Sequence, residues 1–310
     1  MARVIVVGAG VIGLSCAVRL AEAGHRVDVV ARDLPRETTS AVAGAFWSPH
    51  GALPVERARA WSARSYDVFT ELASDPASGV VLRPGTEVFA TEQPEPEWRG
   101  AVPDLARETS LPEGYADGWT FTTPVVEMPL YLDWLAARLA ALGGTLTRIN
   151  LSALPPTGDG EGADLVLDCA GLGARLFAGD LSVEPVRGQV VVVEQVGLDR
   201  VWFDPAGPTY VVPRSGDIVV GGTLQPGEWS RTPDPAAADD ILARAARLVP
   251  EIAGARVLRH KVGLRPARPE VRVERQGDVI HCYGHGGNGV GLSWGCADEV
   301  VSLAGSPAAG

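Results

Sequence analysis

The segment from Arg3 to Ala31 limits the fold more than any other part of the chain. Residues 3–7 (RVIVV) form a continuous β-branched run, which is typical of a strand buried on both faces. Helical apolar spacing then extends from Leu14 to Gly24, and residues 26–31 (RVDVVA) predict a second strand. This order predicts a βαβ unit that opens a doubly wound parallel sheet, so the expected fold class is α/β.

The connection between the first strand and the helix reads Gly8-Ala-Gly10-Val-Ile-Gly13. In a βαβ unit, Gly8 permits a tight turn, Gly10 lets the backbone approach a pyrophosphate, and Gly13 lets helix and strand pack closely. We therefore expect a bound dinucleotide here, with a purely structural turn as the alternative. The second strand ends in Ala31 where an acid is expected, and Asp33 is the candidate to bind the ribose.

A second glycine-rich stretch, residues 283–295 (YGHGGNGVGLSWG), lies close to the other end of the chain. An apolar run at 278–282 precedes it and helical spacing at 292–303 follows it, so it predicts a strand-loop-helix connection. The N-terminus of such a helix presents free N–H groups to an acceptor, whereas a poorly ordered turn is the alternative. A cofactor held by both glycine-rich segments must be long, which favours FAD over a nicotinamide dinucleotide.

Charge and composition exclude several classes of partner. The chain has 310 residues and a formal net charge of −11, which disfavours nucleic acid and anionic membrane surfaces. It contains neither a basic leader followed by a long apolar run nor an apolar stretch of spanning length, so we expect a cytoplasmic protein that is not bound to a membrane. Cys16, Cys169, Cys282 and Cys296 lie in apolar patterns without a Cys-x-x-Cys pair, which predicts small buried hydrophobic side chains and no metal site.

The middle of the chain stops alternating simply between strands and helices. We expect helices at 56–73, 130–142 and 235–249, two strands around a Pro-Gly turn at 80–90, a surface loop at 92–117, a strand at 164–171, strand-rich sequence at 186–225, and a further strand after 256–264. Dinucleotide-type elements at both ends predict a Rossmann-like FAD-binding domain interleaved with a strand-rich α+β substrate domain. The expected FAD-binding domain comprises residues 1–50, 128–186 and 260–310, and the expected substrate-binding domain comprises 51–127 and 187–259.

Several motifs in one order resemble the D-amino-acid oxidase family over nearly the whole chain. They are VIVVGAGVIGL at 4–14, TTSAVAGAFW at 38–47, RGQ at 187–189, YVVP at 210–213, GGT at 221–223, VGLRPARP at 262–269, YGHGG at 283–287 and SWG at 293–295. The family oxidises amino acids by transferring a hydride from Cα to N5 of the flavin of FAD, so the protein must hold the Cα–H bond over the ring.

The resemblance implies three residues that contact the substrate. Arg265 would bind the substrate carboxylate with two parallel N–H groups, and the Tyr210 hydroxyl would give that carboxylate a second hydrogen bond. The backbone carbonyl of Gly287 would accept a hydrogen bond from the substrate amine. The alternatives are a structural ion pair for Arg265, which shares its strand with Arg268 and Arg272, and a tyrosine merely packed on a sheet for Tyr210.

The same resemblance implies a set of cofactor-binding residues. Residues 39–40 and 44–46 match a segment that lines the phosphates and the ring, and the loop at 286–292 would donate N–H groups to the pyrimidine end of the flavin. The full set is Gly8, Gly10, Val11, Ile12, Gly13, Arg32, Asp33, Thr39, Ser40, Gly44, Ala45, Phe46, Gly171, Gly286, Gly289, Val290, Gly291 and Leu292. We expect a structural role for His285.

The expected reaction is oxidative deamination of neutral, aliphatic D-amino acids with oxygen, giving a 2-oxo acid, ammonia and hydrogen peroxide. The segment 201–209 is shorter than the corresponding loop of several relatives, and Leu224 follows the GGT motif. The second active-site tyrosine of those relatives is therefore missing, and the pocket should be more apolar than theirs. Arg200 could instead pair with an acidic substrate and make the protein a D-aspartate oxidase, although a surface arginine is the simpler interpretation. Further alternatives are a glycine or sarcosine oxidase, an NAD(P)-dependent dehydrogenase and a non-catalytic flavin- or nucleotide-binding protein. The sequence is also compatible with a homodimer.

Overall fold

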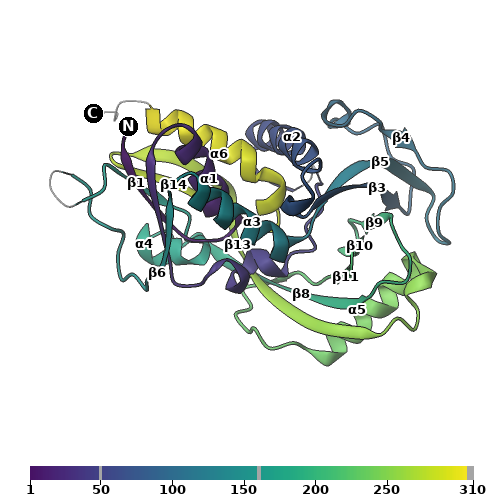
Figure 1. Cartoon of the computed structure of the whole chain (residues 1–310). Helices are drawn as coiled ribbons and strands as arrows, with labels where there is room; N and C mark the ends of the chain where they lie inside the picture. Colours follow the sequence, from purple (N-terminus) through teal and green to yellow (C-terminus); the bar gives the residue numbers. More distant parts are fainter. Residues whose placement is uncertain (49–50, 159–161, 306–310) are drawn as a thin grey trace.

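The computed structural model describes residues 1–48, 51–158 and 162–305. Its strands form one large mixed sheet with the order β4-β5-β3-β9-β10-β11-β8-β13-β14-β7-β1-β2-β6, and β12 pairs with β8 off this path. Figure 1 shows the elements around β1 and β14 at one end and the strands β3, β4 and β5 at the other.

One half of the sheet is parallel. It contains β1 (Arg3–Val7), β2 (Arg26–Ala31), β6 (Thr145–Arg148), β7 (Leu165–Asp168) and β14 (Val279–His285), and every neighbouring pair among them is parallel. Helix α1 (Val11–Glu22) connects β1 to β2 and packs against α6 (Gly289–Gly305) and α3 (Met128–Ala141). The predicted βαβ unit and the α/β fold class are confirmed, and α1 begins three residues earlier than its apolar spacing indicated, at Val11.

The other half of the sheet is largely antiparallel. It contains β3 (Val80–Phe89), β4 (Ala106–Arg107), β5 (Asp117–Val126), β8 (Glu184–Glu194), β9 (Val201–Asp204), β10 (Thr209–Pro213), β11 (Asp217–Gly221) and β12 (Gln225–Pro226). Helix α5 (Pro235–Leu248) packs on β8, β10 and β11, and buried side chains such as Ile218 and Ile241 form the core between them.

A single long strand joins the two halves. β13 (Val257–Gln276) pairs with β8 from Val257 to Ala267 and with β14 from Ala267 to Gln276, with a register irregularity between Ala267 and Arg272. Helix α2 (Val55–Leu72) packs against α6, where a Cβ on Gly295 would lie 2.2 Å from Cα of Trp61. The expected division into an FAD-binding and a substrate-binding domain stays a prediction.

Short elements complete the chain. They are α4 (Ala174–Phe177) and the 3-10 helices η1 (Pro35–Glu37), η2 (Thr39–Val42), η3 (Pro76–Ser78), η4 (Arg99–Ala101), η5 (Gly171–Gly173) and η6 (Pro250–Ile252). None of the helices in the described part of the chain combines the length and apolarity that a membrane crossing requires.

The prediction of two strands around a turn at residues 80–90 is wrong. β3 runs without a break through Pro84 and Gly85, and both residues stay in register with β5. A Cβ on Gly85 would lie 2.8 Å from Cγ2 of Thr123, so this glycine allows a close cross-strand approach and does not mark a turn. The segment 92–117 is also less superficial than predicted, because Trp98 is buried and packs edge-on against Phe121.

Candidate active site

A cavity of about 830 Å³ lies along the carboxyl ends of the parallel strands and reaches into the antiparallel half. Its lining includes the loop after β1, the end of β2, the segment 38–43, and the connection between β14 and α6. Ligands of open α/β sheets bind at this edge of the sheet. The lining also contains Tyr210 from β10 and Arg265 from β13, so the cavity connects both glycine-rich segments with the two predicted substrate-binding side chains.

The loop between β1 and α1 has the geometry of a phosphate-binding turn. Gly8 has a φ of +118°, and a Cβ on it would lie 2.4 Å from the carbonyl oxygen of Cys169. A Cβ on Gly13 would lie 2.0 Å from the Gly8 carbonyl oxygen, whereas a Cβ on Gly10 would meet only the Ser40 hydroxyl, at 3.2 Å. Gly8 therefore allows the tight turn, Gly13 allows the helix to pack against the strand, and Gly10 keeps the cavity wall open.

The N-terminus of α1 faces this open space. Its N-cap is Gly10, which provides no side chain to accept from the first N–H groups, and the Val11 N–H donates to Oγ of Ser40 at 3.0 Å. The remaining free N–H groups and the positive end of the helix dipole fit the pyrophosphate of a dinucleotide.

The cavity wall at the end of β2 carries a charged pair. Arg32 donates two hydrogen bonds to the Asp33 carboxylate, at 3.1 and 2.6 Å, and this contact holds the pKa of Asp33 below its usual value. Arg231, which also lines the cavity, contributes in the same direction. The pair stands where the ribose of a dinucleotide is expected.

The Arg265 guanidinium lies against the backbone of β8. A Cβ on Gly188 would be 2.4 Å from Cζ of Arg265, and Nη1 of Arg265 donates to the Thr223 carbonyl at 2.9 Å. Within the described residues, no carboxylate lies within ion-pair distance of Arg265. Its neighbours on β13 differ, since Arg268 pairs with Asp180 at 2.9 Å and Arg272 pairs with Glu274 at 2.6 Å.

The Tyr210 ring occupies a slot between two glycines. A Cβ on Gly221 would lie 2.0 Å from Cζ of the ring, and a Cβ on Gly44 would lie 2.9 Å from its Cε2. Burial raises the pKa of Tyr210, although the nearby Arg265 guanidinium acts in the opposite direction. The hydroxyl therefore stays protonated at neutral pH and can donate a hydrogen bond beside Arg265.

The second glycine-rich segment is a tight connection. β14 ends at His285, α6 begins at Gly289, and the left-handed Gly284 and Gly286 have φ values of +87° and +55°. A Cβ on Gly287 would meet only the Arg265 side chain, with Cδ 3.5 Å away. Gly287 therefore lies beside Arg265 and leaves space in front of the guanidinium.

The structure brings most of the predicted site residues to one cavity. The lining contains Gly8, Gly10, Val11, Ile12, Gly13, Arg32, Asp33, Thr39, Ser40, Gly171, Tyr210, Arg265, Gly286, Gly287, Gly289 and Val290. The cavity lining does not include Gly44, Ala45, Phe46, Gly291 or Leu292. Gly44 instead makes room for Tyr210, and the Phe46 ring lies 6.0 Å from the Tyr210 ring, so these two residues support the site from behind.

Besides residues 149–151, 172–173 and 176–177, sequence reasoning missed a further segment of the cavity wall. Residues 224–234, which we call the strap, carry Trp229 and Arg231 into the lining. The buried Arg187 donates to the carbonyls of Ser230 and Thr232 at 3.0 and 2.7 Å. The RGQ motif at 187–189 was a signal for this arrangement, because a buried arginine needs several acceptors.

Arg200 lies outside the cavity lining. Its Nη1 donates to Thr86 at 2.8 Å and to the Glu108 carboxylate at 3.3 Å, and its guanidinium stacks over the Trp202 ring. The guanidinium is thus bound by side chains of β3 and the 92–117 segment, and Arg200 is half-buried, whereas the simpler interpretation expected a surface arginine.

Comparison with known proteins identifies similar chains over nearly the full length. A family model described as "FAD dependent oxidoreductase" matches residues 3–303. A D-amino-acid oxidase from Rubrobacter xylanophilus is 51% identical over 317 aligned positions, which cover 99% of this chain and 97% of the relative. A D-aspartate oxidase from Homo sapiens is 36% identical, covering 97% and 94% of the two chains. The crystal structure of glycine oxidase from Geobacillus kaustophilus superimposes with a TM-score of 0.82 at 25% identity, over 98% of this chain and 95% of that one.

Proposed function

This chain belongs to the D-amino-acid oxidase family of FAD-dependent oxidoreductases, and on that premise we propose that it oxidises neutral, aliphatic D-amino acids to 2-oxo acids. The cofactor of the family is FAD, whose flavin accepts a hydride from the substrate Cα and passes the electrons to oxygen, giving hydrogen peroxide. The imine that leaves is hydrolysed to the 2-oxo acid and ammonia.

The observation that carries the proposal is the charge of Arg265. It is the β13 arginine that faces the cavity without a carboxylate partner among the described residues, and its Nη1 donates to the backbone carbonyl of Thr223. A half-buried guanidinium in this state favours an anion. The carboxylate of an amino acid satisfies it through the N–H groups that do not bind Thr223.

Two neighbours of Arg265 would orient the rest of the substrate. The protonated hydroxyl of Tyr210 would donate to the same carboxylate, and the carbonyl of Gly287 would accept from the substrate amine. These three contacts fix the carboxylate and the amine, so the Cα–H bond takes one direction and the side chain takes the remaining space. The β1–α1 loop would hold the FAD, and residues of the β14–α6 connection such as Gly286 and Gly289 would donate N–H groups to it.

The preference for a neutral side chain rests on the charges of the cavity wall. Its charged residues among those described are Arg32, Asp33, Arg231 and Arg265. Arg32 and Arg231 act on Asp33 at the end of β2, and Arg200 is bound to Glu108 outside the cavity. Apart from Arg231, which has no ion pair among the described residues, a second carboxylate on the substrate would find no further unpaired cation in the lining once the first carboxylate has bound Arg265, which disfavours D-aspartate.

The proposal is tested by comparing Arg265→Ala with Arg272→Ala, a matched control on the same strand that is paired with Glu274. Loss of a charge-assisted hydrogen bond costs at least about 1.5 kcal/mol, so we expect KM for D-valine to rise at least about tenfold in Arg265→Ala. Arg272→Ala should leave KM within about twofold of the wild type, because a partly exposed ion pair contributes little. An unchanged KM in Arg265→Ala would contradict the proposal that Arg265 binds the substrate carboxylate.

A further inference from the structure

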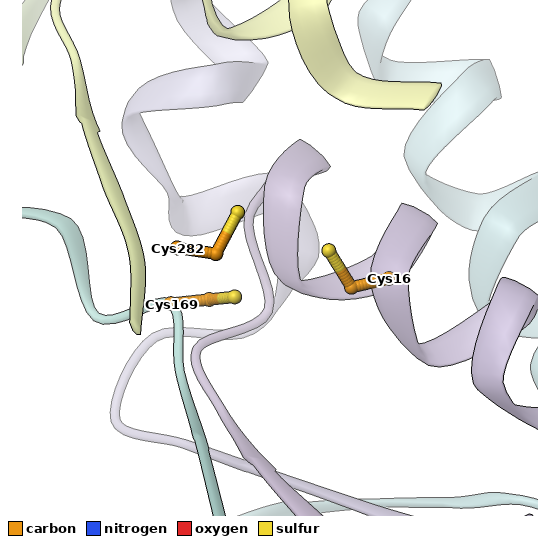
Figure 2. Close-up of side chains that lie close together, drawn as sticks. All are labelled: Cys16, Cys169 and Cys282. Atoms are coloured by element: carbon orange, nitrogen blue, oxygen red, sulfur yellow. The ribbon is translucent and has the colours of Figure 1, made fainter. Parts of the chain in front are cut away.

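The four cysteines, which are far apart in the sequence, meet inside the protein. Cys16 lies on α1, Cys169 follows β7, and Cys282 lies on β14, and their sulfur atoms are all within 4.8 Å of one another. Figure 2 shows the three thiols pointing toward a common space. A second group also contains Cys282, because the ligand atoms of Cys282, His285 and Cys296 lie within 4.8 Å of one another.

Cys169 is half-buried, the other donors are buried, and one of them lacks a partner. Cys16, Cys282 and Cys296 are at most 1% exposed, and His285 is 5% exposed. Nε2 of His285 is buried without a hydrogen-bond partner among the described residues. Because buried polar atoms are almost always paired, an unpaired imidazole nitrogen next to two thiols indicates an absent ligand.

The donor set selects a class of ligand. Thiolate and imidazole are the ligands of thiophilic d¹⁰ cations such as Zn(II), Cd(II) and Cu(I), whereas Mg²⁺ and Ca²⁺ require oxygen donors, which neither group contains. Thiolates that share one zinc ion, with Zn–S distances of about 2.3 Å, stand about 4 Å apart, so the observed separations need only a small contraction.

A cation could reach these donors through the cofactor cavity. Cys169, Cys282 and His285 all belong to its lining. The group lies directly behind the phosphate-binding loop, where a Cβ on Gly13 would be 3.4 Å from Cβ of Cys169.

We propose that Cys282, with Cys16 and Cys169, forms a binding site for one thiophilic d¹⁰ cation, and that His285 and Cys296, which also lie next to Cys282, are further donors for this cation. Binding replaces the thiol protons by the metal and releases them to solvent, with no oxidation or reduction. The site does not include the substrate-contacting residues Arg265, Tyr210 and Gly287, although three of its donors line the cofactor cavity.

The test measures Cd(II) binding to the protein with all its thiols reduced, and Cd(II) is added in one series before FAD and in another after FAD has filled the cavity. Equilibrium dialysis and the ultraviolet thiolate-to-metal charge-transfer band are recorded for the wild type, Cys282→Ser, Cys16→Ser and the control His260→Ala, whose imidazole is exposed and outside both groups. We expect one Cd(II) per chain with a charge-transfer band in the wild type and in His260→Ala, and loss of both signals in Cys282→Ser and Cys16→Ser.

Retention of FAD and an unchanged circular-dichroism spectrum identify the serine variants as folded, and Cys16→Ser decides the test if Cys282→Ser does not fold. The proposal is overturned if the wild type takes up no Cd(II), if the bound ion gives no charge-transfer band, or if the folded serine variants bind Cd(II) like the wild type.

Discussion

The guanidinium of Arg265 lies over Gly188 so closely that a Cβ on this glycine would be 2.4 Å from Cζ, Nη1 and Nη2 of the arginine. The glycine of the RGQ motif on β8 thus makes room for the charge that faces the cavity from β13. Gly188 acts on the substrate only through Arg265, so it is a positioning residue.

Gly188→Ala should displace Arg265 and weaken carboxylate binding. We expect KM for D-valine to rise at least about tenfold, as for loss of a charge-assisted hydrogen bond, while the flavin is retained. Steady-state kinetics of Gly188→Ala and of Gly216→Ala provide the measurement, since a Cβ on Gly216 meets nothing within 4 Å. Equal KM values for the two variants would show that the Arg265 position does not depend on this glycine.

Gly10→Ala should weaken FAD binding without unfolding the protein. The added methyl group would meet only the Ser40 hydroxyl of the protein and would project into the space expected for the pyrophosphate. We expect the Kd for FAD to rise at least about tenfold, as for one lost phosphate contact of about 1.5 kcal/mol. Fluorescence titration of the FAD-free protein measures this, and an affinity equal to that of the wild type would place the cofactor elsewhere.

Arg187→Met should release the strap. The substitution leaves the carbonyls of Ser230 and Thr232 without the charged donor that now binds them, and a hydrogen bond to a charged group contributes about 1.5–3 kcal/mol. Urea unfolding should therefore show a loss of at least about 2 kcal/mol, with faster proteolysis of residues 224–234. The control Arg36→Met removes the exposed pair with Asp133 and should cost less than about 1 kcal/mol. A strap as resistant to protease as in the wild type would refute this role of Arg187.

Asp180 should contribute stability that depends on pH. Burial alone would raise its pKa, but hydrogen bonds from Ser182, Arg268 and Tyr283 outweigh burial and hold the pKa well below its usual value. Because the folded pKa is depressed, the contribution is fully present above the unfolded pKa, about 3.9, and is lost as the pH falls toward the folded pKa.

Asp180→Asn should accordingly lower the free energy of unfolding by more than about 1 kcal/mol at neutral pH, and the deficit should shrink as the pH falls below about 4. Urea unfolding over this pH range, with the exposed Asp133→Asn as control, provides the test. A deficit that is constant with pH would mean that the Asp180 charge is not responsible.

The parts of the fold that the sequence predicts are those in which local pattern and tertiary environment agree. The β-branched run at 3–7, the glycines from Gly8 to Gly13 and the helical spacing after them predict one βαβ unit, and the structure contains it. The pattern at 80–90 misled, because Pro84 and Gly85 usually break strands, and only the packing of Gly85 against Thr123 explains its place within β3.

In the candidate site, too, the sequence predicts the individual residues better than the contacts between them. Motif resemblance brought Arg265 and Tyr210 together correctly, but it could not tell that Gly44 and Gly221 form the slot for the tyrosine ring. Sequence spacing likewise could not predict the cysteine group, since Cys16, Cys169 and Cys282 meet only after α1, β7 and β14 have come together in the fold. Contacts between residues far apart in the chain leave no mark on a local pattern.

The most direct test of the proposed function is the visible spectrum of the FAD-loaded protein without oxygen, recorded before and after addition of D-valine, L-valine or D-aspartate in separate cuvettes. We predict that D-valine bleaches the flavin band, that L-valine leaves it unchanged, and that D-aspartate bleaches it far more slowly. A band that persists with D-valine, or that only D-aspartate or L-valine removes, would contradict the assignment of this chain as an oxidase of neutral D-amino acids.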